Sequence, residues 1–218
     1  MKYFLIIFLT FAQTLTKAQN NDGVFTVVID AGHGGKDSGA VGYKKIKEKD
    51  ITLNMAKAVK ILINEYAKNV TVYLTRSDDR YISLKERTLI SNYFKADLFI
   101  SIHCDANKSH AASGPTIYLQ KKLKSKKYSE ENYKKSARFS LLLNDIFKEQ
   151  LKMNVHKIMF NNYQVLRNTL EKSPSVLIET GYITNKTDAE YYKTKGQKTI
   201  AYAILKAIIK YKNTIKIY

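Results

Sequence analysis

The chain has 218 residues, 44% of them hydrophobic and only two of them proline, so it can bury one substantial core and its length does not require a second domain. Lys and Arg outnumber Asp and Glu by 37 to 19, and the net charge of +18 indicates either an acidic partner or a lysine-rich proteome. The single cysteine, Cys104, excludes an intrachain disulfide and argues against a small disulfide-stapled secreted module.

The first 18 residues, MKYFLIIFLTFAQTLTKA, have the pattern of an export signal. A charged Lys2 precedes an apolar run over 3–12, and Ala18 offers a small residue where a signal peptidase could cut. Because this run is too short to span a bilayer, we interpret residues 1–18 as a removable signal peptide. We therefore expect an exported protein, periplasmic or extracellular, with no transmembrane anchor in the mature chain. Exported proteins rarely meet nucleic acid, so acidic polymers of the cell wall are the expected partners of the surface lysines.

Apolar runs rich in β-branched residues alternate along the chain with helical patterns of apolar residues spaced three and four apart. In chain order they predict a strand at 25–29, a helix at 50–67, a strand at 70–74, a helix at 83–94, strands at 98–102 and 116–119, a helix at 136–151, a strand at 176–178, a short helix, and a last helix with its apolar face over 200–211. Alternating strands and helices predict a single α/β domain whose largely parallel sheet is covered on both faces.

Two capping pairs mark expected helix starts. Ser83 and Glu86 have the spacing of a reciprocal capping box, and Thr187 and Glu190 repeat it before the last helix. The segment 120–135 is rich in lysine and has no apolar face, and we expect a solvated insertion or loop there.

The candidate functional residues come where buried strands end. His33 and His103 follow the first and third predicted strands, and Glu179 follows the strand at 176–178. In such sheets ligands bind beyond the carboxyl ends of the strands, and two imidazoles with a carboxylate are the usual donors for a catalytic zinc ion. Glu48, at the start of the helix after the His33 loop, offers a second acid, so one acid would ligate the metal and the other would transfer protons. The alternatives are hydrogen-bonded structural histidines and, for Glu48, a solvated surface acid.

Several sequence segments resemble a known family. They are VVIDAGHGGKDSGAVG at 27–42, EKDITLNMA at 48–56, LTRSDD at 74–79 with LKER at 84–87, SIHCDAN at 101–107, and the pair YQVLR at 163–167 and PSVLIETGYITN at 174–185. In this order they resemble the type 3 class of zinc-dependent N-acetylmuramoyl-L-alanine amidases, which cleave bacterial peptidoglycan. The resemblance covers nearly all of the mature chain, from about 24 to 210.

The resemblance implies a role for each candidate residue. His33, Glu48 and His103 would bind Zn2+, and Glu179 would be the catalytic acid and base. It further implies a catalytic domain over 24–212 with a six-stranded mixed sheet flanked by helices on both faces. The implied reaction is hydrolysis of the amide that joins N-acetylmuramic acid to the L-alanine of the stem peptide. We expect a monomer that acts on peptidoglycan and does not bind nucleic acid.

Two other activities stay open at this point. The same four residues would serve a zinc peptidase that cuts elsewhere in the stem peptide. A peptidoglycan-binding protein without catalysis would keep the fold, although the intact set of candidate residues argues against it. A basic nucleic-acid-binding protein is disfavoured by the export signal and by the absence of a recognisable nucleic-acid motif.

Further polar residues lie in the matching segments. We expect Arg76 and Arg87 to have a structural role, tying a loop or helix to the sheet through a carboxylate such as Asp79, and Asn107 to have a structural role as well. The two remaining histidines, His110 and His156, lie in polar surroundings, and we interpret them as surface residues.

Overall fold

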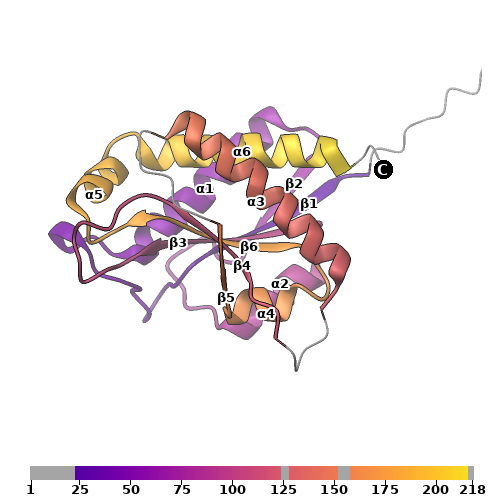
Figure 1. Ribbon diagram of the computed structural model, residues 1–218, viewed down its shortest axis with the longest axis horizontal. Helices are drawn as coiled ribbons and strands as arrows, with labels where there is room; N and C mark the ends of the chain where they lie inside the picture. The colour runs from indigo at the N-terminus through magenta and orange to yellow at the C-terminus, as the bar shows by residue number, and fades with distance from the viewer. Residues whose placement is uncertain (1–22, 124–127, 152–157, 216–218) are drawn as a thin grey trace, which may run out of the picture.

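A mixed β-sheet forms the centre of the protein in the computed structural model, which describes residues 23–123, 128–151 and 158–215 (Figure 1). Among these residues six strands are found: β1 Phe25–Ala31, β2 Val70–Leu74, β3 Leu98–Asp105, β4 Thr116–Gln120, β5 Ile158–Asn161 and β6 Ser175–Tyr182. Their order in the sheet is β2-β1-β3-β6-β4-β5. All neighbouring strands are parallel except β4 and β6, which pair antiparallel.

Helices cover both faces of this sheet, as Figure 1 shows. Their bounds are α1 Glu48–Tyr66, α2 Leu84–Tyr93, α3 Glu130–Gln150, α4 Gln164–Thr169, α5 Lys186–Lys193 and α6 Gly196–Ile215, with a short 3-10 turn at Tyr43–Lys45. The long helices α1, α3 and α6 pack together on one face over the larger apolar core, and α2 and α4 cover a smaller apolar cluster on the other. The α/β fold predicted from the sequence is confirmed.

The register of the parallel strands determines which residues meet at their carboxyl ends. Ala31, the last residue of β1, pairs with Ile102 of β3, so the segment that carries His33 begins beside His103. One strand further along, His103 pairs directly with Glu179 of β6. Because these central strands are buried on both faces, each apolar side chain that leaves water contributes about 1.5–3 kcal/mol to folding. The sheet edge that carries the candidate residues is therefore built on the most buried part of the fold.

The structure corrects two predictions about helix starts. Residues 130–135 belong to α3 and are not a loop, since Ser129 caps this helix by accepting from the backbone N–H of Asn132, and Glu131 pairs with Lys135. Such local bonds start a helix without an apolar face. The prediction that Thr187 and Glu190 cap a helix is also wrong, because α5 begins earlier. Its N-cap is Asn185, whose side chain accepts from the backbone N–H of Asp188.

One further prediction of local structure is confirmed, and others concern residues that the structure does not describe. The capping box is confirmed, with Ser83 and Glu86 bonded reciprocally at the start of α2. Strand β5 was not predicted from its own residues, since it is a short and mostly exposed edge strand. Residues 1–18 and His156 lie outside the described residues, and the domain bounds 24–212 stay a prediction. None of the helices in the described ranges is both long enough and apolar enough to cross a membrane.

Candidate active site

The loop after β1 presents His33. This residue has a left-handed backbone conformation, with φ 59°. Its Nδ1 lies 2.8 Å from Asp37 Oδ2, and its Nε2 lies 3.0 Å from Glu48 Oε1. Burial would lower the pKa of His33, but the hydrogen bonds and charges of Glu48 and Asp37 raise it. A carboxylate on one ring nitrogen orients the imidazole and leaves the other nitrogen to face a ligand, as in many metal sites.

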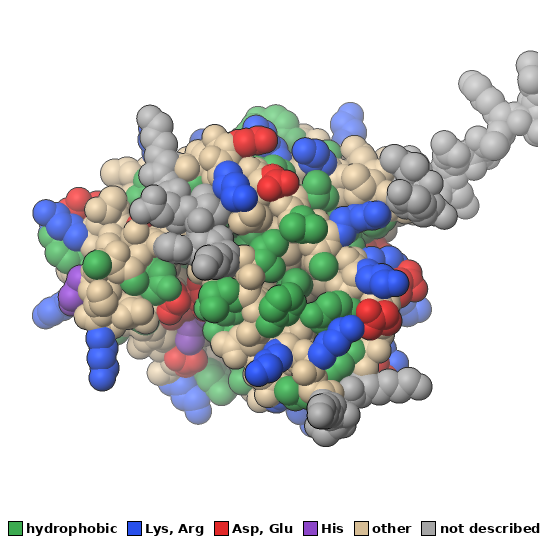
Figure 2. Space-filling view, in the orientation of Figure 1, with side chains coloured by type: hydrophobic (Ala, Val, Ile, Leu, Met, Phe, Trp, Pro, Cys, Tyr) green, Lys and Arg blue, Asp and Glu red, His purple; other side chains and the backbone are tan. Residues whose placement is uncertain are grey.

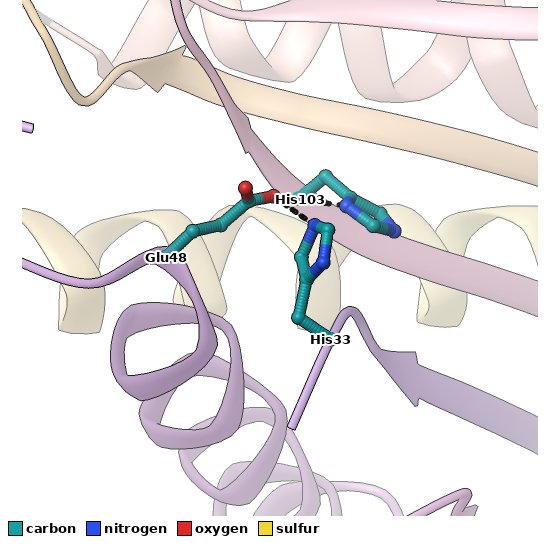
Figure 3. Close-up of side chains that lie close together, drawn as sticks. All are labelled: His33, Glu48 and His103. Atoms are coloured by element: carbon teal, nitrogen blue, oxygen red, sulfur yellow. Dashed lines mark hydrogen bonds and ion pairs between the residues drawn. The ribbon is translucent and has the colours of Figure 1, made fainter. Parts of the chain in front are cut away.

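Glu48 is the first residue of α1 and lies between the two histidines. Its Oε1 is 2.9 Å from His103 Nδ1 and 3.0 Å from His33 Nε2, and Figure 3 shows the three side chains pointing toward one another. The backbone N–H of Cys104 donates to Oε1, and that of Ala40 donates to Oε2. Although burial raises the pKa of a carboxyl group, the hydrogen bonds and charges of the two histidines hold that of Glu48 well below its ordinary range. Glu48 is therefore an ionised, buried carboxylate, and the alternative of a solvated surface acid is wrong.

These three side chains fit a bound metal ion. One ligand atom from each of His33, Glu48 and His103 lies within 4.8 Å of the other two. In a tetrahedral zinc site with bonds of about 2.0–2.1 Å, neighbouring ligand atoms lie about 3.3–3.4 Å apart. The two observed nitrogen to oxygen distances, 3.0 and 2.9 Å, are only slightly shorter. Two imidazoles and one carboxylate are moreover the donor set of many catalytic zinc sites, which leave one position open.

Glu179 lies beside this group but is not part of it. It follows the buried run of β6, where it pairs with His103 of β3 on one side and Thr116 of β4 on the other. Its Oε2 is buried and has no hydrogen-bond partner among the described residues. Burial raises the pKa of Glu179 well above its ordinary value, and the charges of Glu48 and Asp105 raise it further. A carboxyl group with a raised pKa can take up and release a proton near neutral pH, as a general acid and base must.

All four residues open into one cavity of about 380 Å3 at the carboxyl ends of β1, β3 and β6. Its other walls include Leu84 of α2 and Tyr163 and Gln164 at the start of α4. These two helices cover the face of the sheet opposite to α1. The ring of Tyr163 packs edge-on against Tyr118 of β4, with centroids 5.2 Å apart. A substrate in this cavity would therefore lie between the histidines and a wall of apolar and aromatic side chains.

Two arginines hold the loop that carries His33, as the sequence predicted. Arg76 donates to the carbonyl oxygens of Ala31 and Gly32, and Arg87 donates to those of Ala31 and His33. The prediction that these arginines act through a carboxylate such as Asp79, however, was wrong. Arg87 pairs at 2.7 Å with Asp30 of β1, a fully buried residue that the sequence analysis missed.

The remaining polar candidates have structural contacts. Asp79 accepts from Lys49 Nζ and from the backbone N–H of Gly35. Asn107 accepts from the N–H of Ser109 through its side chain. His110 is exposed, and its Nδ1 donates to the carbonyl oxygen of Thr184.

Gly39 is the position where a small change should disturb the site most directly. Its φ is +62°, and an added Cβ would lie 2.6 Å from Glu48 Oε2 and 2.7 Å from the His33 ring. The left-handed conformation alone costs a residue with a Cβ about 1–2 kcal/mol. We expect Gly39→Ala to lower the zinc content of the purified protein, measured by inductively coupled plasma mass spectrometry.

Gly23 provides the matched control, because a Cβ added there meets nothing within 4 Å. Gly23→Ala should bind zinc like the unchanged protein. If Gly39→Ala also kept its full zinc content, the close approach of Gly39 to Glu48 and His33 would not matter for metal binding.

Fold and site together define the class of this protein: an α/β enzyme fold with the donor set of a metal-dependent hydrolase at the carboxyl ends of its central strands. Comparison with known proteins gives the family. The family model described as N-acetylmuramoyl-L-alanine amidase, Amidase_3, matches residues 27–210. The chain therefore belongs to the Amidase_3 family of N-acetylmuramoyl-L-alanine amidases.

Individual relatives agree with this assignment. A putative N-acetylmuramoyl-L-alanine amidase of Buchnera aphidicola is 32% identical over 82% of this chain and 91% of the relative. The probable cell wall amidase LytH of Staphylococcus aureus is 38% identical over 85% of this chain but only 57% of its own length. The chain thus spans about half of the length of the LytH proteins that it matches.

Solved structures show the same fold. The catalytic domain of CwlV, an N-acetylmuramoyl-L-alanine amidase from Bacillus (Paenibacillus) polymyxa var. colistinus, superposes with a TM-score of 0.76 at 34% identity, covering 87% of this chain and 98% of that one. The CwlD amidase of Clostridioides difficile, solved in complex with the GerS lipoprotein, gives a TM-score of 0.76 at 28% identity, covering 87% and 99%.

Proposed function

We propose that this protein hydrolyses the amide bond between N-acetylmuramic acid and the L-alanine of the stem peptide in peptidoglycan. In this proposal His33, Glu48 and His103 hold a zinc ion, and Glu179 is the catalytic acid and base. The observation that carries the proposal is the position of Glu179, whose buried Oε2 has no partner among the described residues, in the same cavity as the three ligand atoms. Family membership supplies the bond that is cleaved.

Each residue has a separate task in this reaction. The zinc ion would act as a Lewis acid that lowers the pKa of water toward neutrality and polarises the scissile carbonyl. Glu179 accepts the proton of the attacking water and passes it to the nitrogen of L-alanine, which leaves poorly without a proton. Asp37 orients the His33 ring through Nδ1. Leu84 and Tyr163 line the side of the cavity opposite the histidines, where they would contact the substrate.

The place of action is part of the proposal. The matched relatives include proteins named cell wall amidases, which supports an exported protein. We propose that it acts as a monomer in the periplasm or outside the cell, and that its excess of lysine helps it stay on acidic wall polymers.

The reaction and its metal can be tested together by mass spectrometry of purified peptidoglycan after incubation with the protein. We expect release of stem peptides that begin with L-alanine, loss of this activity on chelation, and recovery with added zinc. His103→Ala should abolish it because a ligand is lost, whereas His110→Ala, which removes an exposed histidine in the same segment, should not.

Other outcomes would select the alternatives. Cleavage within the stem peptide would make the protein a zinc peptidase. Unchanged peptidoglycan in the presence of folded, zinc-loaded protein would leave a binding function only.

A further inference from the structure

A second cavity, of about 420 Å3, lies at the opposite edge of the sheet, where β3 and β6 begin. Asp97 directly precedes β3, and Lys172 lies in the loop before β6; α2, α3 and α6 supply the other walls. The eight residues of β3 separate this cavity from the carboxyl-end site by about 26 Å. It is therefore a separate place on the molecule, and the proposed hydrolysis gives it no task.

Three lysines line this cavity: Lys95 after α2, Lys135 of α3 and Lys172. Lys135 pairs with Glu131 at 2.6 Å. Within the described part of the chain, Lys95 and Lys172 have no carboxylate at ion-pair distance. The acid in the lining, Asp97, uses Oδ2 to accept from the backbone N–H of Thr26. The cavity thus has an excess of positive charge.

Basic side chains continue beside the cavity. A neighbouring groove shares Lys135 and is lined by Lys134 and Arg138 together with Glu131. Figure 2 shows Lys and Arg side chains along the right-hand edge of the molecule, with some Asp and Glu side chains between them, where Figure 1 places the C-terminal end of α6 and the beginning of α3. An extended basic surface of this kind suits a ligand with repeated negative charges.

The walls also contain polar atoms without a protein partner. Tyr211 Oη and Asn92 Oδ1 are buried and have no hydrogen-bond partner among the described residues. Buried polar groups in folded proteins are usually paired with protein, water or a ligand. Because these two atoms have less than 1 Å2 of exposed surface, the polar character that an occupant would meet comes from the lysines of the lining.

We propose that this cavity binds a phosphate group carried on a sugar or polyol, as in a phosphodiester polymer of the cell wall. Separate lysine ammonium groups bind phosphate as point charges, whereas a planar carboxylate is matched best by the fork of an arginine, and the described residues that line this cavity include no arginine. The volume exceeds what one phosphate needs and falls in the usual range for ligand pockets, which leaves room for the unit that carries it. Anchoring at this second site would raise the local concentration of the enzyme on the wall.

The test is an NMR titration of the uniformly 15N-labelled full chain with glycerol 3-phosphate, with glycerol as the uncharged control. We expect saturable shifts at Lys95 and Lys172 with the phosphate ester and none with glycerol. Lys95→Gln combined with Lys172→Gln should weaken binding by at least about tenfold, since charge-assisted hydrogen bonds are lost. The matched control removes two exposed lysines elsewhere, Lys57→Gln with Lys206→Gln, and should bind like the unchanged protein.

Equal weakening in both double variants would show a general charge effect and overturn the proposal, as would shifts confined to His33 and His103.

The source of the phosphate is decided by repeating the titration with poly(glycerol phosphate). Tighter binding than the monomer, lost in the same variant, identifies a polymer, and equal binding identifies a free phosphate ester. Equally tight binding of a DNA oligonucleotide would overturn the assignment to a wall polymer. Because no hydrolysis is measured, failure of this site and failure of the proposed reaction are distinguishable.

Discussion

Replacing Glu179 by glutamine is expected to lower the rate of peptidoglycan hydrolysis by about 10²–10⁴-fold while leaving the zinc content unchanged. Glutamine has the shape of glutamic acid but cannot take up or release a proton under these conditions. The group of side chains that can hold a metal comprises His33, Glu48 and His103 without Glu179, so metal binding should not need this carboxyl group. Turnover measured by release of stem peptides and metal content measured by mass spectrometry separate the two effects.

Asp105→Asn is the matched control for this experiment. Asp105 lines the same cavity, and its Oδ1 accepts from the backbone N–H of Ala106. We expect a much smaller loss of activity from Asp105→Asn, because this carboxylate contributes only through its charge, which raises the pKa of Glu179, and transfers no proton itself. A comparable loss in both variants would mean that negative charge in the cavity matters and that Glu179 has no special role. Loss of zinc in Glu179→Gln would instead make Glu179 a ligand.

Asp30→Asn is expected to destabilise the folded protein by about 3–5 kcal/mol, the usual cost of removing one partner from a buried ion pair. Asp30 is fully buried, and Thr75, Arg87 and Ser101 each donate a hydrogen bond of 2.7 Å to its carboxylate. The neutral amide would leave the Arg87 guanidinium buried without a counter-charge. Unfolding in urea, followed by circular dichroism, measures this loss.

The same carboxylate gives a pH dependence with a defined sign. Burial raises the pKa of Asp30, but the charge and hydrogen bond of Arg87, with smaller effects of His103 and Ser101, outweigh burial and lower it. A lowered pKa in the folded state means that the stabilisation is fully present above the unfolded pKa, about 4, and is lost as pH falls through the folded value. The stability of Asp30→Asn should accordingly depend less on pH below about 4.

An exposed ion pair supplies the control for Asp30. Asp78 pairs with Arg80, and both side chains are more than half exposed. Asp78→Asn should leave the free energy of unfolding almost unchanged, since exposed pairs contribute little. If Asp30→Asn were as stable as Asp78→Asn, the buried pair would not stabilise the fold.

Because Arg87 also donates to the carbonyl oxygen of His33, we expect Asp30→Asn to bind zinc more weakly as well.

Most of the secondary structure could be predicted from the sequence because its signals are local. The apolar runs of β1, β2 and β3 and the amphipathic pattern of α1 each lie within a single strand or helix. Residues close together in the sequence are therefore enough to predict these elements. The start of α3 was missed because residues 130–135 have no apolar face, and its first turns depend on the Ser129 cap and an ion pair. Strand β5 has four residues, and its pairing with β4 across the chain determines it more than its own composition.

The sequence by itself determined the fold class and the candidate residues. His33, His103 and Glu179 follow strands whose carboxyl ends meet at one edge, and Glu48 begins the helix after the His33 loop. Only the tertiary structure decided how they meet. Glu48 is 55 residues from His103, and Arg87 is 57 residues from Asp30. No local pattern encodes such contacts, because they form only when the packing of helices on the sheet brings distant segments together and removes their polar groups from water.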